Sequence, residues 1–364
     1  MMTPLESARR RLLPLVEQEL RAVLDRRAGR PNGPRLAGRA TEPPVRLEPN
    51  APGHYGMMRY HLGWLDEQLS PVNGPTGKRL RPLICLLAVE ACGGEAERAV
   101  PAAVALELLH NFTLIHDDVE DGDPVRHHRP TVWKLWGEAQ AINAGDGMHV
   151  LAYLTLLELA GRGVPPATVV ALARRLAETS LAVTEGQHLD LAFERRADVS
   201  PAEYLDMIAR KSAALLGCAA ATGAEIAAAP PEWVEALLAY GHYLGMGFQI
   251  RDDILGIWGE EETTGKPAGD LRRRKKTLPS LYALSRADDG DKEALRSLFA
   301  SSEPGDDDVR RALEVLERTG ARQHCERRVS HYSATARSQL QVLPETAARQ
   351  ALDTLAVQLE TREY

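Results

Sequence analysis

Apolar side chains recur at intervals of three and four residues along most of this chain, which is the spacing of amphipathic helices. Residues 5–28 form the first such segment, and from Tyr55 onward the spacing continues almost without interruption. No run alternates β-branched and polar residues over the length of a strand, and both Asn-Gly pairs lead directly into a proline, so the sequence predicts no hairpin. The pattern therefore predicts an all-α fold.

Two segments interrupt the helical pattern. Residues 29–53 are rich in Gly, Pro and Arg, which is typical of a loop or linker. Residues 286–309 are acidic and contain Asp-Asp-Gly and Glu-Pro-Gly, so we expect parts of them to form exposed turns. A length of 364 residues is typical of two domains, but the continuous helical pattern favours one. We expect an N-terminal helix and linker over residues 1–53 and a single all-helical domain over residues 54–364.

Composition and charge exclude several classes of protein. With 44% hydrophobic residues, 26% charged residues and a formal net charge of −7, the chain has a globular composition without the cationic excess of a nucleic-acid binder. The four cysteines form no CxxC pair, which argues against a zinc site or a disulfide framework and fits a reducing cytoplasm. The N-terminus lacks the features of a signal peptide, and no uncharged apolar run approaches the roughly 18 residues that span a bilayer. We therefore expect a cytoplasmic protein with no integral membrane segment.

The first candidate site is the segment LIHDDVEDGDPVRHHRPT at residues 114–131. Asp117 and Asp121 are one helical turn apart at the end of an apolar helix, so their carboxylates share one face. Two carboxylates that leave further positions to water and substrate oxygens are the usual ligands of Mg²⁺. Arg126 follows closely, as expected where an anion bridges acids and cations. Taken alone, the segment is equally compatible with an acidic, solvated helix end.

A second segment, residues 247–279, repeats this arrangement. Asp252 and Asp253 lie at the end of an apolar helix and are followed by a run of cations: Lys266, Arg272, Arg273, Arg274, Lys275 and Lys276. Two acid pairs, each followed by cations, predict two parts of one site for a metal-bridged polyanion. A solvated loop remains the alternative for the basic run.

Two shorter basic elements add to this prediction. Lys78, Arg79 and Arg81 lie at a predicted helix start, where the helix dipole favours anions. Lys211 and Ser212 follow another apolar helix, although a surface position is the ordinary interpretation of a lone lysine. Both elements are therefore candidates for binding the same polyanion.

The chain contains, in this order, the segments GKRLRP, LIHDDVED with RPT shortly after, GQHLDL (186–191), KSA (211–213), FQIRDD and GKPAGDLRRRKKTLP. These segments resemble the motifs of the trans-type polyprenyl diphosphate synthases. The resemblance extends from about Tyr55 to the C-terminus, and so many motifs in the same order are highly specific. It implies a bundle of long antiparallel helices around a central cavity, usually in a homodimer. It also implies condensation of an allylic prenyl diphosphate with isopentenyl diphosphate to give an all-trans prenyl diphosphate.

The resemblance further implies a role for each matching residue. The implied ligands of magnesium, three ions with substrate bound, are Asp117, Asp121 and Asp252. The allylic diphosphate would be bound by Arg126, Lys211, Lys266 and Lys275, with Ser212 and Gln249 lining the site. Isopentenyl diphosphate would be bound by Lys78, Arg81 and His110, next to His127. The implied catalytic set is Asp117, Asp121, Asp252 and Lys211. A histidine such as His110 on an apolar helix is usually a core residue, but its place about two turns before the acids, on their face, favours binding.

Two positions depart from the family's pattern. Gly256 stands where the second acidic motif usually ends in aspartate, so we expect a weakened third metal ion. His127 stands where the family commonly has a second arginine. Neutral imidazole binds phosphate less well than guanidinium, so we expect weaker or pH-sensitive binding of isopentenyl diphosphate.

The expected product has fifteen or twenty carbons, with twenty preferred. In this family a bulky residue five positions before the first aspartate shortens the product, and that residue here is Phe112. Two alternatives stay open. A class I terpene cyclase on the same fold would not need the second diphosphate site formed by Lys78, Arg81 and His110. A regulatory subunit without catalysis would have no use for intact acid pairs, which repel each other without a metal.

Overall fold

The computed structural model describes residues 2–28, 53–72, 74, 77–259 and 268–361. These residues are all-α with almost no strand, which confirms the predicted fold class. They divide into two compact units. Unit 1 comprises Met1–Glu6, Leu87–Gly94 and Arg175–Tyr364, and unit 2 comprises Ser7–Leu86 and Glu95–Arg174.

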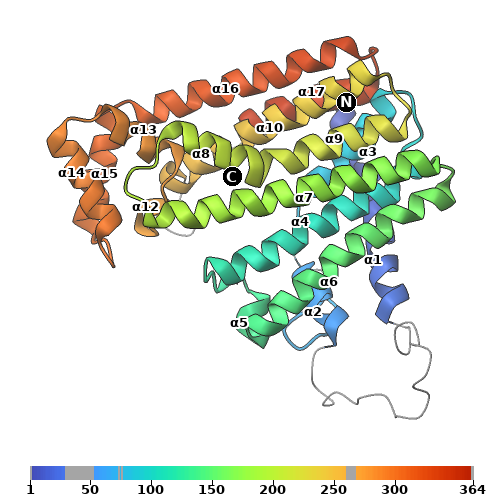
Figure 1. Cartoon of the computed structure of the whole chain (residues 1–364), viewed down its shortest axis with the longest axis horizontal. Helices are drawn as coiled ribbons and strands as arrows, with labels where there is room; N and C mark the ends of the chain where they lie inside the picture. Colours follow the sequence, from blue (N-terminus) through green and yellow to red (C-terminus); the bar gives the residue numbers. More distant parts are fainter. Residues whose placement is uncertain (1, 29–52, 73, 75–76, 260–267, 362–364) are drawn as a thin grey trace. The chain divides into compact units, whose positions relative to one another are not determined.

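Unit 2 is centred on α4 (Val100–Glu120), which packs against α6 (Glu138–Leu157) (Figure 1). Leu108, Leu109 and Ile115 are fully buried on α4, as their spacing predicts. The unit also holds most of α1 (Pro4–Ala28), the first half of α3 (Leu80–Ala91) and the start of α7 (Pro166–Arg195). Its smaller elements are α2 (His54–His61), η1 (Ala96–Ala99), β1 (Val125–Arg126), β2 (Arg129–Pro130), α5 (Val132–Trp136) and η2 (Glu158–Arg162).

A buried ion-pair network fixes the predicted N-terminal helix, α1, within unit 2. The Arg79 side chain donates to Glu17 on α1 at 2.5 Å and to Glu107 on α4 at 2.8 Å. Arg79 is 5% exposed and Glu107 is 3% exposed, so removing one partner would leave a buried charge unpaired. Arg79, which the sequence groups with Lys78 and Arg81, therefore has a structural role.

Unit 1 is centred on α10 (Pro231–Trp258), which packs against α9 (Ala214–Ile226) and α16 (Ala321–Gln339) (Figure 1). A Cβ added at Gly241 would lie 2.3 Å from the carbonyl oxygen of Leu216, so glycine is what lets α9 approach. The other elements are α8 (Pro201–Ile208), a π-helical turn η3 (Ala209–Ala213), α12 (Gly269–Arg272), α13 (Leu278–Arg286), α14 (Asp289–Ala300), α15 (Asp306–Arg318), η4 (Leu340–Val342) and α17 (Ala347–Glu360), with the end of α7.

The structure corrects one local prediction and refines another. Strands β1 and β2 form a short hairpin although none was predicted, because its turn is made by His127 and His128 in left-handed conformation (φ 51° and 62°) rather than by Asn-Gly. Within the acidic segment 286–309, residues 301–305 lie between helices as expected, but Leu295 and Leu298 bury one face of a further helix, α14.

Within the described parts of the chain, one helical stretch, Ala96–Glu120, is long and apolar enough to span a bilayer by length and composition. Its most apolar window is 78% buried inside the protein, which is the behaviour of a core helix.

Candidate functional site

The first acidic motif lies at the C-terminal end of α4. The helix ends at Glu120, and Asp121 is its C-cap. Arg126 on β1 donates to Asp118 at 2.7 Å and to Asp117 at 3.3 Å. Asp118 is 1% exposed, and burial raises its pKa to about 6 although Arg126 opposes this. Asp118, which the sequence analysis did not select, thus anchors Arg126 beside Asp117.

The residues predicted to bind isopentenyl diphosphate lie together beside this motif in unit 2. Burial lowers the pKa of Arg81 to about 10, and its Nε has no hydrogen-bond partner among the described residues. Burial also holds the pKa of His110 well below its ordinary value, and the charges of Arg81 and Arg126 add to that effect. The pKa of His127 is lowered by burial, by Arg126 and by Lys78. These predicted residues therefore form one cationic cluster.

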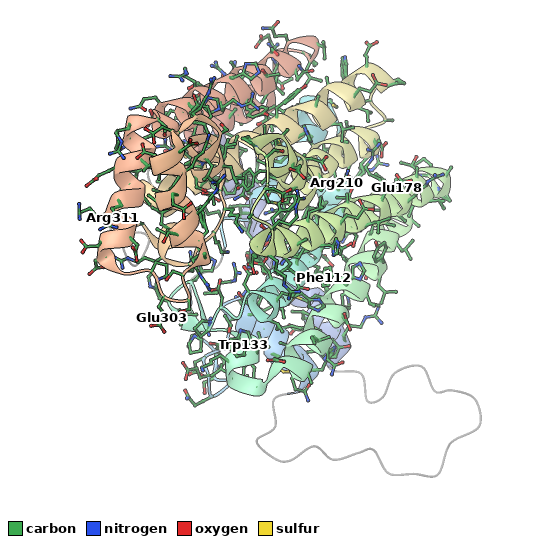
Figure 2. All side chains as sticks on the ribbon, turned by 60° about the vertical axis from the view of Figure 1, so that its left-hand side comes forward. Phe112, Trp133, Glu178, Arg210, Glu303 and Arg311 are labelled. Carbon is green, nitrogen blue, oxygen red and sulfur yellow. The ribbon has the colours of Figure 1, made fainter. Side chains whose placement is uncertain are left out.

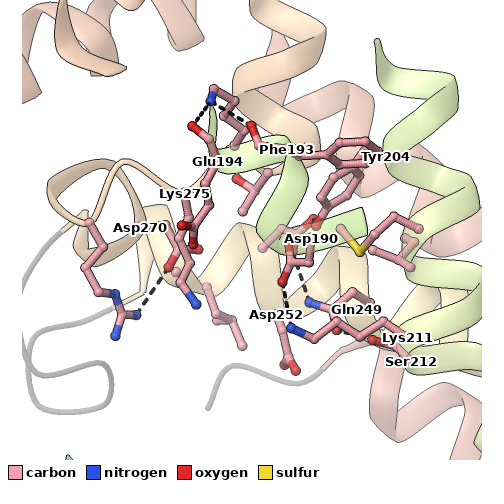
Figure 3. Close-up of a pocket in the computed structure, with 18 residues that line it drawn as sticks. Asp190, Phe193, Glu194, Tyr204, Lys211, Ser212, Gln249, Asp252, Asp270 and Lys275 are labelled. Carbon is pink, nitrogen blue, oxygen red and sulfur yellow. Dashed lines mark hydrogen bonds and ion pairs between the residues drawn. The ribbon is translucent and has the colours of Figure 1, made fainter. Parts of the chain in front are cut away.

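Unit 1 contains a pocket of about 430 Å³ where α7, α8, α10 and the segment 270–277 meet (Figure 3). Its lining combines carboxylates with cations. Lys211 donates to Asp190 at 2.6 Å, and Ser212 donates to Gln249 at 2.6 Å. Five of the predicted residues line the pocket: Lys211, Ser212, Gln249, Asp252 and Lys275.

The two adjacent aspartates of the second motif occupy different surroundings. Asp253 is 2% exposed and accepts hydrogen bonds from Tyr204 Oη at 2.7 Å, Gln249 Nε2 at 3.2 Å and the Leu278 amide at 3.4 Å. Burial raises the pKa of Asp253 to about 7, although the bonds from Tyr204 and Gln249 oppose this rise. Asp253 therefore joins α8, α10 and α13, while Asp252 lines the pocket.

The basic run after α12 is mostly held by structural contacts. Arg272 pairs with Asp306 at 2.8 Å, and Arg274 donates to the Ser301 carbonyl at 2.9 Å. Lys276 donates to two carbonyls at the end of α7, at 2.9 and 2.8 Å. Lys275 lines the pocket (Figure 3), and Arg273 and Lys276 of the same run line it too. Lys266 lies outside the described residues.

Glycine 256, the departure from the second motif, faces a carboxylate from another segment. A Cβ added at Gly256 would lie 2.0 Å from an oxygen of Asp270, so the Asp270 side chain fills the space of a residue-256 side chain. Asp270 is 8% exposed, and burial raises its pKa although Arg273, at 3.3 Å, opposes this. An acidic side chain from α12 therefore lies where a side chain at position 256 would otherwise lie.

The π-helical turn η3 presents Lys211 to the pocket. A Cβ added at Gly186 of α7 would lie 2.3 Å from the Lys211 backbone nitrogen, so this glycine lets the turn approach α7. The adjacent Arg210 instead pairs with Glu185 and Asp206 on an exposed side (Figure 2). Lys211 follows helix α8, as the sequence predicts, and lies in a wide turn between α8 and α9. Such turns are frequent at functional sites.

Phe112 on α4 (Figure 2) lies within an aromatic layer of unit 2. Its ring stacks on His149 of α6 with centroids 4.6 Å apart and contacts the edge of His116 at 4.8 Å. Phe112 is 7% exposed. Two histidine rings therefore fix the position of Phe112, the residue predicted to limit product length.

Sequence reasoning did not select several residues that the structure places at these two sites. Asp190 and Asp270 lie within recognised motifs, so their sequence context gave a signal. The sequence gives no such signal for Tyr204 or His61. Only the tertiary structure brings Tyr204 next to Asp253 and His61 near Arg126.

Comparison with known proteins identifies close relatives. A profile described as polyprenyl synthetase matches residues 63–316. The chain is 43% identical over 270 residues to (2E,6E)-farnesyl diphosphate synthase of Mycobacterium tuberculosis, covering 73% of this chain and 74% of that protein. The crystal structure of a polyprenyl synthetase from Streptomyces coelicolor is similar with a TM-score of 0.82 at 35% identity, covering 98% of both chains. That of a Corynebacterium glutamicum geranylgeranyl pyrophosphate synthase, complexed with isoprenyl diphosphate and magnesium, has a TM-score of 0.75 at 27% identity, covering 99% of this chain and 98% of that chain.

Proposed function

The chain belongs to the polyprenyl synthetase family, and we propose that it condenses an allylic prenyl diphosphate with isopentenyl diphosphate to give an all-trans product of fifteen or twenty carbons. The observation that carries this proposal is that each unit contains one site that combines acids with cations. One combines Asp117 and Asp121 with a cationic cluster, and the other combines Asp252 with Lys211 and Lys275. A synthase with two diphosphate substrates needs both.

The reaction breaks the C–O bond of the allylic diphosphate, and the diphosphate leaves with the electron pair. Arg126, Lys211 and Lys275 would bind this leaving group and stabilise its developing charge. Lys78, Arg81 and His110 would hold isopentenyl diphosphate so that its double bond attacks the allylic cation. A new C–C bond forms, and the proton that is lost passes to the released diphosphate. Phe112 and the buried face of α4 would keep water from the cation.

We propose that Asp117, Asp121 and Asp252 bind magnesium, with three ions when substrate is present. Bound magnesium supplies positive charge that stabilises the leaving diphosphate. The donor set fits this ion, because one or two carboxylates with substrate oxygens and waters complete its coordination. Asp118 also keeps one buried oxygen without a partner among the described residues.

Replacing Gly256 with alanine is expected to raise the magnesium concentration needed for half-maximal activity about 10-fold, because the new methyl group would displace the Asp270 carboxylate. The measurement is the magnesium concentration that gives half-maximal product formation. Gly247 offers a control on the same helix, since a Cβ there would meet nothing closer than 3.4 Å. Equal magnesium dependence in G256A and G247A would remove Asp270 from the site.

Replacing Phe112 with alanine is expected to lengthen the product, because the ring that stacks on His149 would no longer block the growing chain. Mass analysis of the products measures this directly. The substitution also removes buried aromatic area, so the variant should be assayed below its unfolding temperature. An unchanged product length would show that another residue limits elongation.

A homodimer is part of the proposal. Helix α6 exposes Ile142, Val150, Leu154 and Leu157 on one face, at 44%, 57%, 39% and 49%. Exposed large apolar side chains on one face of a helix are typical of a protein–protein contact. We also propose a cytoplasmic location.

The experiment that tests the function compares incubations of an allylic diphosphate and magnesium with and without isopentenyl diphosphate. The proposal predicts a longer prenyl diphosphate only when isopentenyl diphosphate is present. Cyclised hydrocarbons without it would instead identify a terpene cyclase, and no magnesium-dependent release of diphosphate would favour a regulatory subunit.

A further inference from the structure

Glu17 lies on α1, outside residues 63–316 that match the family profile. Its carboxylate nevertheless accepts a hydrogen bond from Arg79 Nε at 2.5 Å, and its side chain is partly buried. Arg79 stands between Lys78 and Arg81, two of the residues that we propose for isopentenyl diphosphate. A helix that precedes the matched region therefore holds the residue between two members of the proposed site.

The same network of hydrogen bonds continues into α4, where it surrounds a third residue of that site. Arg79 Nη1 donates to Glu107 Oε1 at 2.8 Å. The Asn111 amide donates to the same oxygen at 3.0 Å and to the Glu107 carbonyl at 2.7 Å. Glu107 and Asn111 are 3% and 5% exposed, and His110 lies between them on α4. The three residues proposed to bind isopentenyl diphosphate therefore each lie within two positions of a member of this network.

The backbone of Arg79 makes the directions of its neighbours depend on this network. Its φ is 48°, in the left-handed region that residues with a side chain rarely adopt. Its carbonyl accepts from the Leu83 amide at 3.1 Å, so this residue also begins the first turn of α3. The Arg79 side chain is buried while Lys78, one position earlier, is exposed. Because such a backbone conformation persists only where its surroundings hold it, the two carboxylates that bind the Arg79 side chain also fix this change of direction.

We propose that Glu17 is a positioning residue of the isopentenyl diphosphate site, where it holds Arg79 and thereby fixes the directions of Lys78 and Arg81. The inference rests on the proposed function of those two cations. Removing the Glu17 carboxylate leaves a buried guanidinium with an unpaired Nε, so the Arg79 side chain is expected to shift and its backbone to relax. Lys78 and Arg81 would then turn away from a bound diphosphate. Among the described residues that line the pocket of unit 1, none belongs to this network.

The test is steady-state kinetics of Glu17→Ala with each diphosphate substrate varied in turn. E17A is expected to raise the KM for isopentenyl diphosphate about 10-fold, while the KM for the allylic diphosphate stays within about twofold of wild type. Glu19, two positions later on α1, provides a matched control, because it pairs with Arg26 at 3.0 Å and with Arg162 at 3.4 Å. E19A also removes a carboxylate that pairs α1 with arginine, and it should leave both KM values near wild type.

An E17A variant with the wild-type KM for isopentenyl diphosphate, or with both KM values raised to the same extent, would overturn the inference while leaving the proposed function intact. If E17A fails to fold, E17Q decides, because its amide oxygen still accepts from Arg79 but carries no charge. We expect E17Q to raise the same KM about threefold, since hydrogen bonds to a charged acceptor are the stronger ones. An unchanged KM in E17Q would then overturn the inference. Wild-type protein that does not extend the allylic diphosphate when isopentenyl diphosphate is present would contradict the proposed function itself.

Discussion

Replacing Asp252 with asparagine is expected to lower the rate of product formation by at least about 100-fold while leaving the fold intact. Asp252 lines the pocket with Lys211 and Lys275, and an amide does not supply the negative charge that a bound magnesium ion requires. The measurement is kcat for the variant, together with its thermal unfolding temperature.

The adjacent Asp253 is a matched control with the opposite outcome. Its two carboxylate oxygens accept from Tyr204, Gln249 and the Leu278 amide, so D253N would place an amide donor against other donors. We expect D253N to lower the free energy of unfolding by about 1–3 kcal/mol. If D252N retained wild-type kcat, or lost as much stability as D253N, the division between a functional and a structural aspartate would be wrong.

Replacing Gly186 with alanine is expected to lower both stability and activity. The new Cβ would lie 2.3 Å from the Lys211 backbone nitrogen and 2.7 Å from its Cα, and backbone atoms move less easily than side chains. We expect a loss of about 2 kcal/mol from overpacking and a fall in kcat of about 100-fold from displacement of Lys211. Thermal unfolding and steady-state kinetics measure the two effects.

Gly161 is the matched control, since a Cβ there meets nothing within 4 Å. G161A should therefore leave unfolding and kcat near wild type. A G186A variant that is as stable and active as G161A would contradict this prediction. It would mean that α7 and η3 can move apart without a loss of stability or a displacement of Lys211.

Local regularity explains why most of the fold was predictable. Apolar spacing indicates helices directly, and the positions of Leu12, Leu20 and Leu24 predicted α1, in which all three are fully buried. The β1–β2 hairpin was not predictable in this way. Its turn depends on left-handed His127 and His128, for which the sequence has no ordinary turn signal.

Candidate site residues were predictable only where a motif contains them. Asp117, Asp252, Lys211 and Lys275 lie in motifs. The structure places Asp117 beside Arg126 and the other three on the lining of one pocket. The division of labour within the motifs was not predictable, because it depends on burial and on partners distant in sequence. Arg79 becomes structural through Glu17 and Glu107, and the loss of an acid at Gly256 is matched by Asp270 from a separate segment.

The central claim is that the acidic motifs of this chain bind magnesium and activate an allylic diphosphate. The most direct measurement is a crystal structure of the protein with magnesium and an allylic thiolodiphosphate, which ionises too slowly to react. We predict magnesium held by Asp117, Asp121 and Asp252, and a diphosphate in contact with Lys211 and Lys275. Magnesium or diphosphate bound away from these residues would contradict the claim.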